Sequence, residues 1–191
     1  MKKQNKPDTI KTPVGTVEWA HLITPDTKYK EEGQYKLDLI MSSADAQPVI
    51  DAIAEKYDAF YAAQLEETGK SKLKRYDLPW EENDGDVKFR FRRKAVIQTK
   101  KGPWDRRPSV TDKNGQEITQ RISNGSKARV AFELYFWNTP TLGVGVTLQP
   151  CFVRVEELVE YKSAGDISPF DTEEAKPAAR KTGTDDEEIT W

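Results

Sequence analysis

An alternation of apolar and polar residues with a period of two runs through most of the chain between residues 14 and 158. Such alternation places successive side chains on opposite faces of a strand. It predicts strands over residues 14–23, 34–41, 87–99, 104–111, 117–122, 127–137 and 144–158, and Asn114-Gly115 predicts a tight turn before residue 117. We therefore expect a mainly β domain.

One segment, residues 44–67, departs from this alternation because its apolar residues recur three and four positions apart. This spacing predicts an inserted helix, which Ser43 can cap and Gly69 can end. Residues 70–86 are predicted as a long polar loop. About half a dozen strands and one helix favour a small five-stranded, partly open barrel, although periodicity alone does not distinguish a barrel from a sandwich.

Composition excludes several kinds of site. The chain has 191 residues with one histidine, His21, and one cysteine, Cys151, so neither an intrachain disulfide nor a four-ligand Cys/His zinc site can form. We expect no metal and no cofactor. The basic N-terminal residues are not followed by an apolar signal region, and no 18 apolar residues run together, so we expect a soluble intracellular protein without a membrane partner.

Charge is distributed unevenly along the chain. Residues 163–191 carry eight acidic and three basic residues without periodicity, which predicts a disordered acidic tail. Residues 88–107 carry nine basic residues and one acidic residue. We expect a flexible arm over residues 1–13, a domain over residues 14–162 and the tail over residues 163–191. A strongly basic segment in such a chain indicates a polyanionic partner.

Two of the predicted strands combine a core face with a basic face. In residues 127–137 the core face is apolar and the other face holds Lys127, Arg129, Tyr135 and Trp137. In the strand beginning at residue 87, the cations Lys88, Arg90, Arg92 and Lys94 share one face. If these strands were neighbours, they would form one basic surface with exposed aromatic rings.

Single-stranded nucleic acid needs such a surface, because cations contact its phosphates and aromatic rings stack on its bases. Trp104 stands among cations in a Gly-Pro loop that would suit the edge of a groove. The candidate DNA-contacting residues are Lys88, Arg90, Arg92, Lys94, Lys100, Trp104, Arg106, Arg107, Lys127, Arg129, Tyr135 and Trp137.

Structural interpretations of the same residues stay open. The cations can form an ordinary solvated face, and Tyr135 and Trp137 can cover the predicted helix instead of contacting bases. Four other aromatic residues are interpreted as core: Trp19, Tyr35, Phe89 and Phe91. His21 and Cys151 are interpreted as half-buried residues without a role.

The segments GSKARVAFELYFW and GVGVTLQPCFVRVEEL, with an acidic tail that closes on DDEEITW, resemble the single-stranded DNA-binding proteins of tailed bacteriophages. The resemblance implies an OB-fold with an inserted helix and no enzymatic activity. It also implies action in phage DNA replication, recombination and repair, in the cytoplasm of the infected host, as a monomer or homodimer. Asp185, Asp186, Glu187, Glu188 and Trp191 match the tail segment that competes with DNA and recruits phage or host replication proteins.

Two other functions are alternatives. Asp86 and Lys88 form an Asp-x-Lys step at the start of a strand, with Asp77, Glu81, Glu82 and Asp84 nearby, as in a metal-dependent nuclease. A strand-annealing recombination protein would also bind single strands, but it would assemble into rings or filaments.

Overall fold

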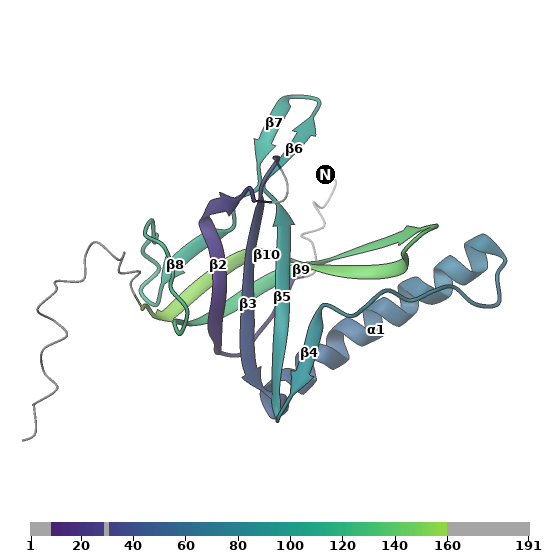
Figure 1. Ribbon diagram of the computed structural model, residues 1–191, viewed down its shortest axis with the longest axis horizontal. Helices are drawn as coiled ribbons and strands as arrows, with labels where there is room; N and C mark the ends of the chain where they lie inside the picture. Colours follow the sequence, from purple (N-terminus) through teal and green to yellow (C-terminus); the bar gives the residue numbers. More distant parts are fainter. Residues whose placement is uncertain (1–8, 29–30, 160–191) are drawn as a thin grey trace, which may run out of the picture. The chain divides into compact units, whose positions relative to one another are not determined.

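Five strands close on one another into a barrel: β2 (Gly15–Asp26), β3 (Gln34–Ser42), β5 (Asp86–Lys94), β9 (Lys127–Thr139) and β10 (Gly143–Glu157). This is a computed structural model, and it describes residues 9–28 and 31–159. The hydrogen-bonded order is β9-β2-β3-β5-β10, and β10 also pairs with β9 to complete the ring (Figure 1). The β5–β10 pairing is parallel and the other four are antiparallel. The predicted OB-fold-like five-stranded barrel is confirmed.

Short strands extend this barrel. β1 (Ile10–Lys11) pairs with β9, so two residues of the expected N-terminal arm lie in the sheet. β4 (Trp80–Asn83) pairs with β5, so the prediction of a long polar loop over residues 70–86 is wrong for these four residues. β8 (Ser109–Asp112) pairs with β10, while β6 (Val96–Thr99) and β7 (Gly102–Asp105) form a separate two-stranded hairpin.

The predicted strand over residues 117–122 is wrong. The turn before it is present, since Asp112 Oδ1 accepts hydrogen bonds from the backbone N–H groups of Asn114, at 2.8 Å, and Gln116, at 2.9 Å. After the turn the chain forms isolated bridges in place of a strand, one between Glu117 and Thr111 and another at Ile122. Ile118 and Ile122 are buried four positions apart, so this irregular segment closes the core without joining the sheet.

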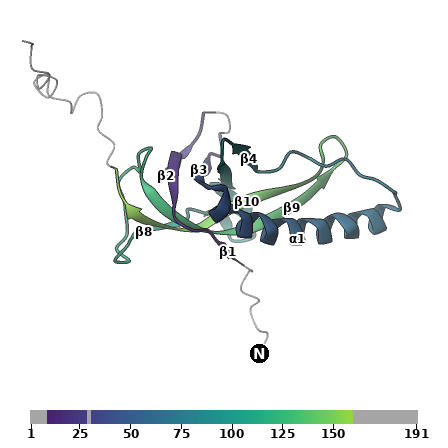
Figure 2. The same cartoon turned by 90° about the horizontal axis from the view of Figure 1, so that it is seen from below.

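The helix α1 (Ser43–Thr68) confirms the predicted insertion. Ser42, and not Ser43, is its N-cap: the Ser42 hydroxyl accepts a hydrogen bond from the Asp45 N–H at 3.2 Å. Gly69 ends the helix with a φ of 65°. The helix runs beside the outer end of the β9–β10 ribbon (Figure 2). The Phe60 ring of the helix stacks on the Phe136 ring of β9, with centroids 5.0 Å apart.

The barrel interior contains the side chains that the alternation assigned to it. Leu37, Leu39, Phe89, Phe91 and Phe132 are fully buried, as are Val17 and Leu148. The Tyr35 prediction is also confirmed, but the Trp19 prediction is wrong, because its side chain is 62% exposed. Among the described residues, no helix has the length and apolar character to cross a membrane.

The chain divides into two units, Met1–Tyr161 and Lys162–Trp191. The described residues all belong to the first unit. The tail residues Asp185 to Glu188 and Trp191 lie outside the described residues, as do residues 1–8 of the expected arm.

Candidate nucleic-acid interface

The four predicted cations of β5 are all in ion pairs. Lys88 Nζ lies 2.8 Å from Glu18 Oε2, and Arg92 Nη1 lies 2.7 Å from Asp38 Oδ1. Arg90 pairs with Glu81 of β4, and Lys94 lies 3.8 Å from Glu32. The hydrogen bond that Lys88 donates to Glu18 raises the pKa of Lys88, and this effect exceeds the opposing effect of burial. The positive charges on the outer face of β5 are therefore largely neutralised by carboxylates. The excess of basic residues in the sequence of this segment did not indicate that.

A hollow of about 390 Å³ lies where β5, β9 and β10 meet the base of the β6–β7 hairpin. We call it the arginine hollow; it is lined by Gln34, Arg92, Arg93, Lys94, Ile97, Arg106, Tyr135, Thr147 and Gln149. It brings together four of the predicted residues, Arg92, Lys94, Arg106 and Tyr135. The Tyr135 side chain is 56% exposed there.

Two guanidinium groups in the arginine hollow form no ion pair with a carboxylate among the described residues, although the charge of Glu133 acts on Arg106 and opposes the lowering of its pKa. Arg106 Nη2 donates to Gln149 Oε1 at 2.9 Å, and Arg93 Nη1 donates to the carbonyl oxygen of Pro150 at 3.0 Å. Burial and the neighbouring Arg93 charge lower the pKa of Arg106. Because the two positive charges repel each other in a partly desolvated place, a bound anion would be stabilised by both.

Trp137 continues the aromatic surface beyond Tyr135. Its indole lies against the backbone of Gly145, where a Cβ atom would overlap the ring, and its Nε1–H donates to Thr147 Oγ1 at 3.2 Å. Tyr76 packs edge-on against the same ring, with centroids 5.0 Å apart. On the helix side, the ring that stacks on Phe60 of α1 belongs to the neighbouring residue Phe136.

The β6–β7 hairpin stands over this region. Trp104 is opposite Ile97 in the hairpin register, and cross-strand partners share a face. Since Ile97 lines the arginine hollow, Trp104 lies on the same side of the hairpin and is 55% exposed. Lys100 is exposed at the tip. The Tyr35 hydroxyl ties the hairpin to the barrel by donating to Asp105 Oδ1 at 3.0 Å.

The remaining predicted residues lie elsewhere. Lys127 and Arg129 are at the opposite end of β9, where Lys127 Nζ donates to Thr16 Oγ1 at 2.6 Å and Arg129 Nε lies 3.2 Å from Glu156. Arg107 lies 3.9 Å from Glu117. The strands β5 and β9 are not neighbours, because β10 lies between them.

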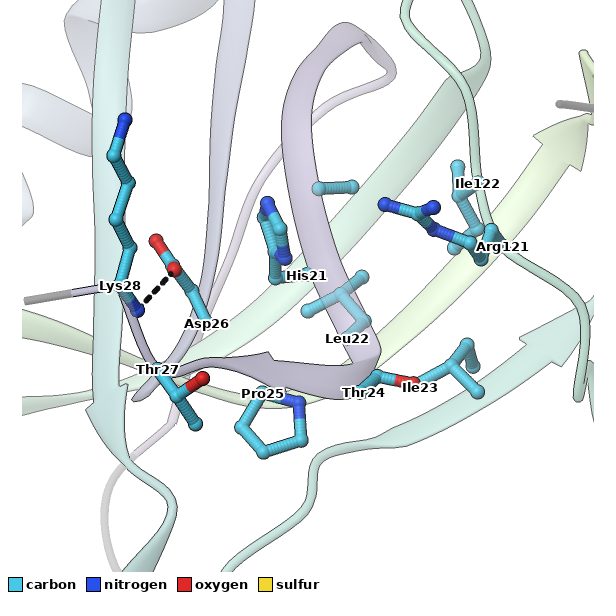
Figure 3. Close-up of a pocket in the computed structure, with 11 residues that line it drawn as sticks. His21, Leu22, Ile23, Thr24, Pro25, Asp26, Thr27, Lys28, Arg121 and Ile122 are labelled. Atoms are coloured by element: carbon cyan, nitrogen blue, oxygen red, sulfur yellow. Dashed lines mark hydrogen bonds between the residues drawn. The ribbon is translucent and has the colours of Figure 1, made fainter. Parts of the chain in front are cut away.

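Two features were missed at the sequence level. Trp19 is exposed at a bulge in β2 with a φ of 51°, and its N–H donates to Asn124 Oδ1 at 2.8 Å. A second hollow of about 410 Å³ follows it, lined by residues of β2 with Lys28, Arg121 and Ile122 (Figure 3). Burial and the charge of Lys36 lower the pKa of His21 in this hollow. No local pattern distinguished Trp19 from the alternating residues around it.

The carboxylates of the nuclease alternative do not converge. Glu81 pairs with Arg90, and Lys88 pairs with Glu18. Within residues 9–28 and 31–159, no three Asp, Glu, His or Cys side chains are grouped in a way that could hold a metal ion.

Comparison with known proteins places this geometry in context. A family model described as the single-stranded DNA-binding protein of bacteriophage T7 matches residues 14–158. The crystal structure of gp2.5, a single-stranded DNA-binding protein encoded by bacteriophage T7, is similar with a TM-score of 0.73 and 27% identity, over 84% of this chain and 97% of that chain.

More distant structures share the fold. The single-stranded DNA-binding protein of bacteriophage Enc34, truncated at its C-terminus, has a TM-score of 0.57 and 15% identity over 80% of this chain and 87% of that chain. The same phage protein in complex with single-stranded DNA has a TM-score of 0.56 and 14% identity over 80% of this chain and 88% of that chain. A search of curated proteins finds no match.

Proposed function

This chain belongs to the single-stranded DNA-binding protein family of bacteriophage T7, and from that membership we propose that it binds single-stranded DNA in the arginine hollow without sequence preference. The observation that carries the proposal is the pair Arg93 and Arg106, two guanidinium groups that form no ion pair with a carboxylate among the described residues, beside the exposed ring of Tyr135. Phosphate supplies the missing anion, and an unpaired base supplies a face for the ring.

The surrounding residues extend this path in two directions. Trp137, held against Gly145, gives a second aromatic position next to Tyr135 on β9. Trp104 and Lys100 place a ring and a charge on the hairpin above. Base stacking and phosphate contacts tolerate any sequence, and each stacked base contributes about 1–3 kcal/mol.

The β5 cations contribute less in this proposal. Lys88 and Arg90 already have carboxylate partners, so a phosphate must compete with Glu18 or Glu81 for them. Arg92 and Lys94 line the hollow but are paired as well. The unpaired guanidinium groups therefore provide most of the attraction for phosphate.

The test is equilibrium binding of labelled single-stranded and double-stranded oligonucleotides of equal length, measured across salt concentration. We expect a single-strand preference, and a loss of affinity of about 5-fold to about 150-fold in Tyr135→Ala, the equivalent of about 1–3 kcal/mol. Arg106→Gln should reduce the log–log salt slope by about 0.7.

Lys113→Gln, at an exposed turn, and Lys88→Gln, which removes a paired cation, are the matched controls for charge. Both should change affinity much less than Arg106→Gln. Equal binding of the two DNA forms, or a Lys88→Gln effect as large as that of Arg106→Gln, contradicts the proposed site.

We also propose that the chain acts in phage DNA replication, recombination and repair inside the infected host. In this proposal Asp185 to Glu188 and Trp191 compete with DNA and recruit replication proteins. Support comes from the charge of residues 163–191, which have eight acidic and three basic residues in a tethered segment.

A further inference from the structure

A bulge in β10 reverses the faces of that strand. Before it, Val144, Val146 and Leu148 are buried; after it, Val153 and Val155 are buried. The pairing with β9 shifts between Pro150 and Phe152, so Cys151 is the additional residue. Phe152, which simple alternation from Val144 would put in the core, is therefore turned outward and is 40% exposed.

The outward ring stands beside a shallow slot. Phe152 is opposite Ala131 on β9, and Ala131 is opposite Lys11 on β1. The small Ala131 side chain leaves a hollow of about 340 Å³ whose lining includes Phe152 and three cations: Lys11, Arg129 and Arg154. We call this place the Phe152 slot. It has a flat apolar wall, a small floor and a basic rim.

The charges on the rim are not balanced. Arg154 Nη2 lies 2.7 Å from Glu156 Oε1, and Arg129 Nε lies 3.2 Å from the same oxygen. One carboxylate thus serves two guanidinium groups, and Lys11 adds a third positive charge. These charges beside the Phe152 ring would suit an anionic ligand that also carries a flat ring.

The Phe152 slot lies on the same outer face of the β9–β10 ribbon as the arginine hollow. Ala131, opposite Phe152, is four residues before Tyr135 on β9, with the same side-chain parity. Four residues of strand span about 13 Å. Arg93 joins the two places, since its Nη1 donates to the carbonyl oxygen of Pro150 at the bulge.

We propose that the Phe152 slot is a second base-stacking position, which holds a nucleotide of the same DNA strand that occupies the arginine hollow. Phe152 stacks on the base, and Lys11, Arg129 and Arg154 contact the adjoining phosphates. Bulges of this kind re-aim a side chain near a functional site. The inference rests on the proposed function and extends its site along the β9–β10 ribbon.

The test uses the full chain with a series of labelled oligothymidines from about 4 to about 16 nucleotides, the range of site sizes for single OB folds. We expect the affinity of Phe152→Ala to match wild type for the shortest oligonucleotides that bind. For the longest ones it should fall by about 5-fold to about 150-fold. Arg154→Gln should lower the salt slope for long oligonucleotides only, by at most about 0.7, because a phosphate shares Arg154 with Glu156.

Two further variants separate stacking from folding. Ala131→Leu keeps Phe152 but fills the space beside it, so it should weaken the binding of long oligonucleotides as Phe152→Ala does. Phe152→Trp keeps a flat ring and should bind long oligonucleotides with wild-type affinity. Leu78→Ala, which truncates another exposed apolar side chain, is the matched control and should bind as wild type.

The outcomes separate this inference from the proposed function. If Phe152→Ala and Ala131→Leu match wild type at every length while Tyr135→Ala weakens all lengths, the slot inference is overturned and the arginine hollow remains. That result also follows if the slot takes a protein side chain instead of a base. If wild type binds no oligothymidine of any length, the proposed function fails first.

Discussion

The backbone of Trp19 adopts a φ of 51°, in the left-handed region that β-branched and bulky residues avoid. Its side chain contributes little to the core, since it is mostly exposed. The conformation is held by the bulge in β2 and by the hydrogen bond from its N–H to Asn124 Oδ1. Strain of this kind is retained where the surrounding structure determines the backbone.

We predict a reversed order of stability at this position. At an ordinary strand position a protein with Val is more stable than one with Asn, but Asn tolerates the left-handed region and Val does not. We therefore expect the unfolding free energy of Trp19→Asn to be about 1–2 kcal/mol higher than that of Trp19→Val, as measured by urea denaturation. An ordinary strand order, with Val above Asn, would show that this φ is not maintained in solution.

Tyr35 provides a prediction for alkaline pH. Burial, and then its hydrogen bond to Asp105, raise the pKa of Tyr35 from 10.0 to about 12. A folded-state pKa above the unfolded one stabilises the protein below pH 10, and this contribution is lost as pH rises from about 10 to about 12. Urea denaturation across this range should show a steeper fall for wild type than for Tyr35→Phe. Parallel curves for the two proteins would contradict the assignment.

The residues of the site were only partly predictable from the sequence, because the partners of each side chain come from other strands. Alternation correctly separated Phe89 and Phe91 from the outward cations of β5. It could not show the carboxylates that neutralise those cations, because Glu18 and Asp38 come from other strands. Arg93 could not be recognised as part of the hollow, because it adjoins the bulge of β10, a feature of the tertiary structure.

At the level of elements, the β9–β10 ribbon depends on a residue without a side chain. The indole of Trp137 occupies the space over Gly145 that any other residue would need. The helix and the barrel strands were predictable because their periodicity is long and regular. The four-residue strand β4 was not, since its residues Glu81, Glu82 and Asn83 are exposed and show no alternation.

Gly145→Ala should displace the Trp137 ring. We expect a loss of about 1–3 kcal/mol in unfolding free energy, as for other insertions into a packed contact, with a changed tryptophan emission spectrum. Thermal unfolding followed by fluorescence measures both. Gly115→Ala, with no atom within 4 Å of the added Cβ, is the control for the emission spectrum, which should stay unchanged in that variant. An unchanged emission spectrum in Gly145→Ala would contradict the packing.

The β6–β7 hairpin should be removable without loss of the barrel, because it forms a sheet of its own. Replacing residues 98–103 with a short turn removes Lys100 and Lys101. If both contact phosphates, the log–log salt slope for single-stranded DNA falls by about 1.4, at about 0.7 for each contact. Circular dichroism confirms that the barrel persists. An unchanged slope with an intact barrel would exclude the hairpin from the DNA path.

For the whole molecule, the acidic segment sets the charge balance. Residues 1–162 have 27 basic and 24 acidic residues, whereas residues 163–191 have three and eight. Deleting residues 163–191 should tighten binding to single-stranded DNA, most at low salt, where a tethered competitor is strongest. Titrations of the full and shortened chains measure the difference.

The matched control for the deletion keeps the chain length and changes four charges, with Asp185 and Asp186 replaced by Asn and Glu187 and Glu188 by Gln. It should reproduce most of the effect of the deletion. Equal or weaker binding by the shortened chain would remove the competition mechanism.

The number of paired residues differs between neighbouring strands of the barrel. The β5–β10 join rests on one residue pair, Phe91 with Leu148, and the β2–β9 join on two pairs, whereas β3 and β5 share nine. The arginine hollow has residues of β5 on one wall and residues of β10 and β9 on the other. If DNA binds in the arginine hollow as proposed, the strand would bridge β5 and β10 across this single pair, so the DNA-bound barrel should resist mechanical unfolding better than the free one.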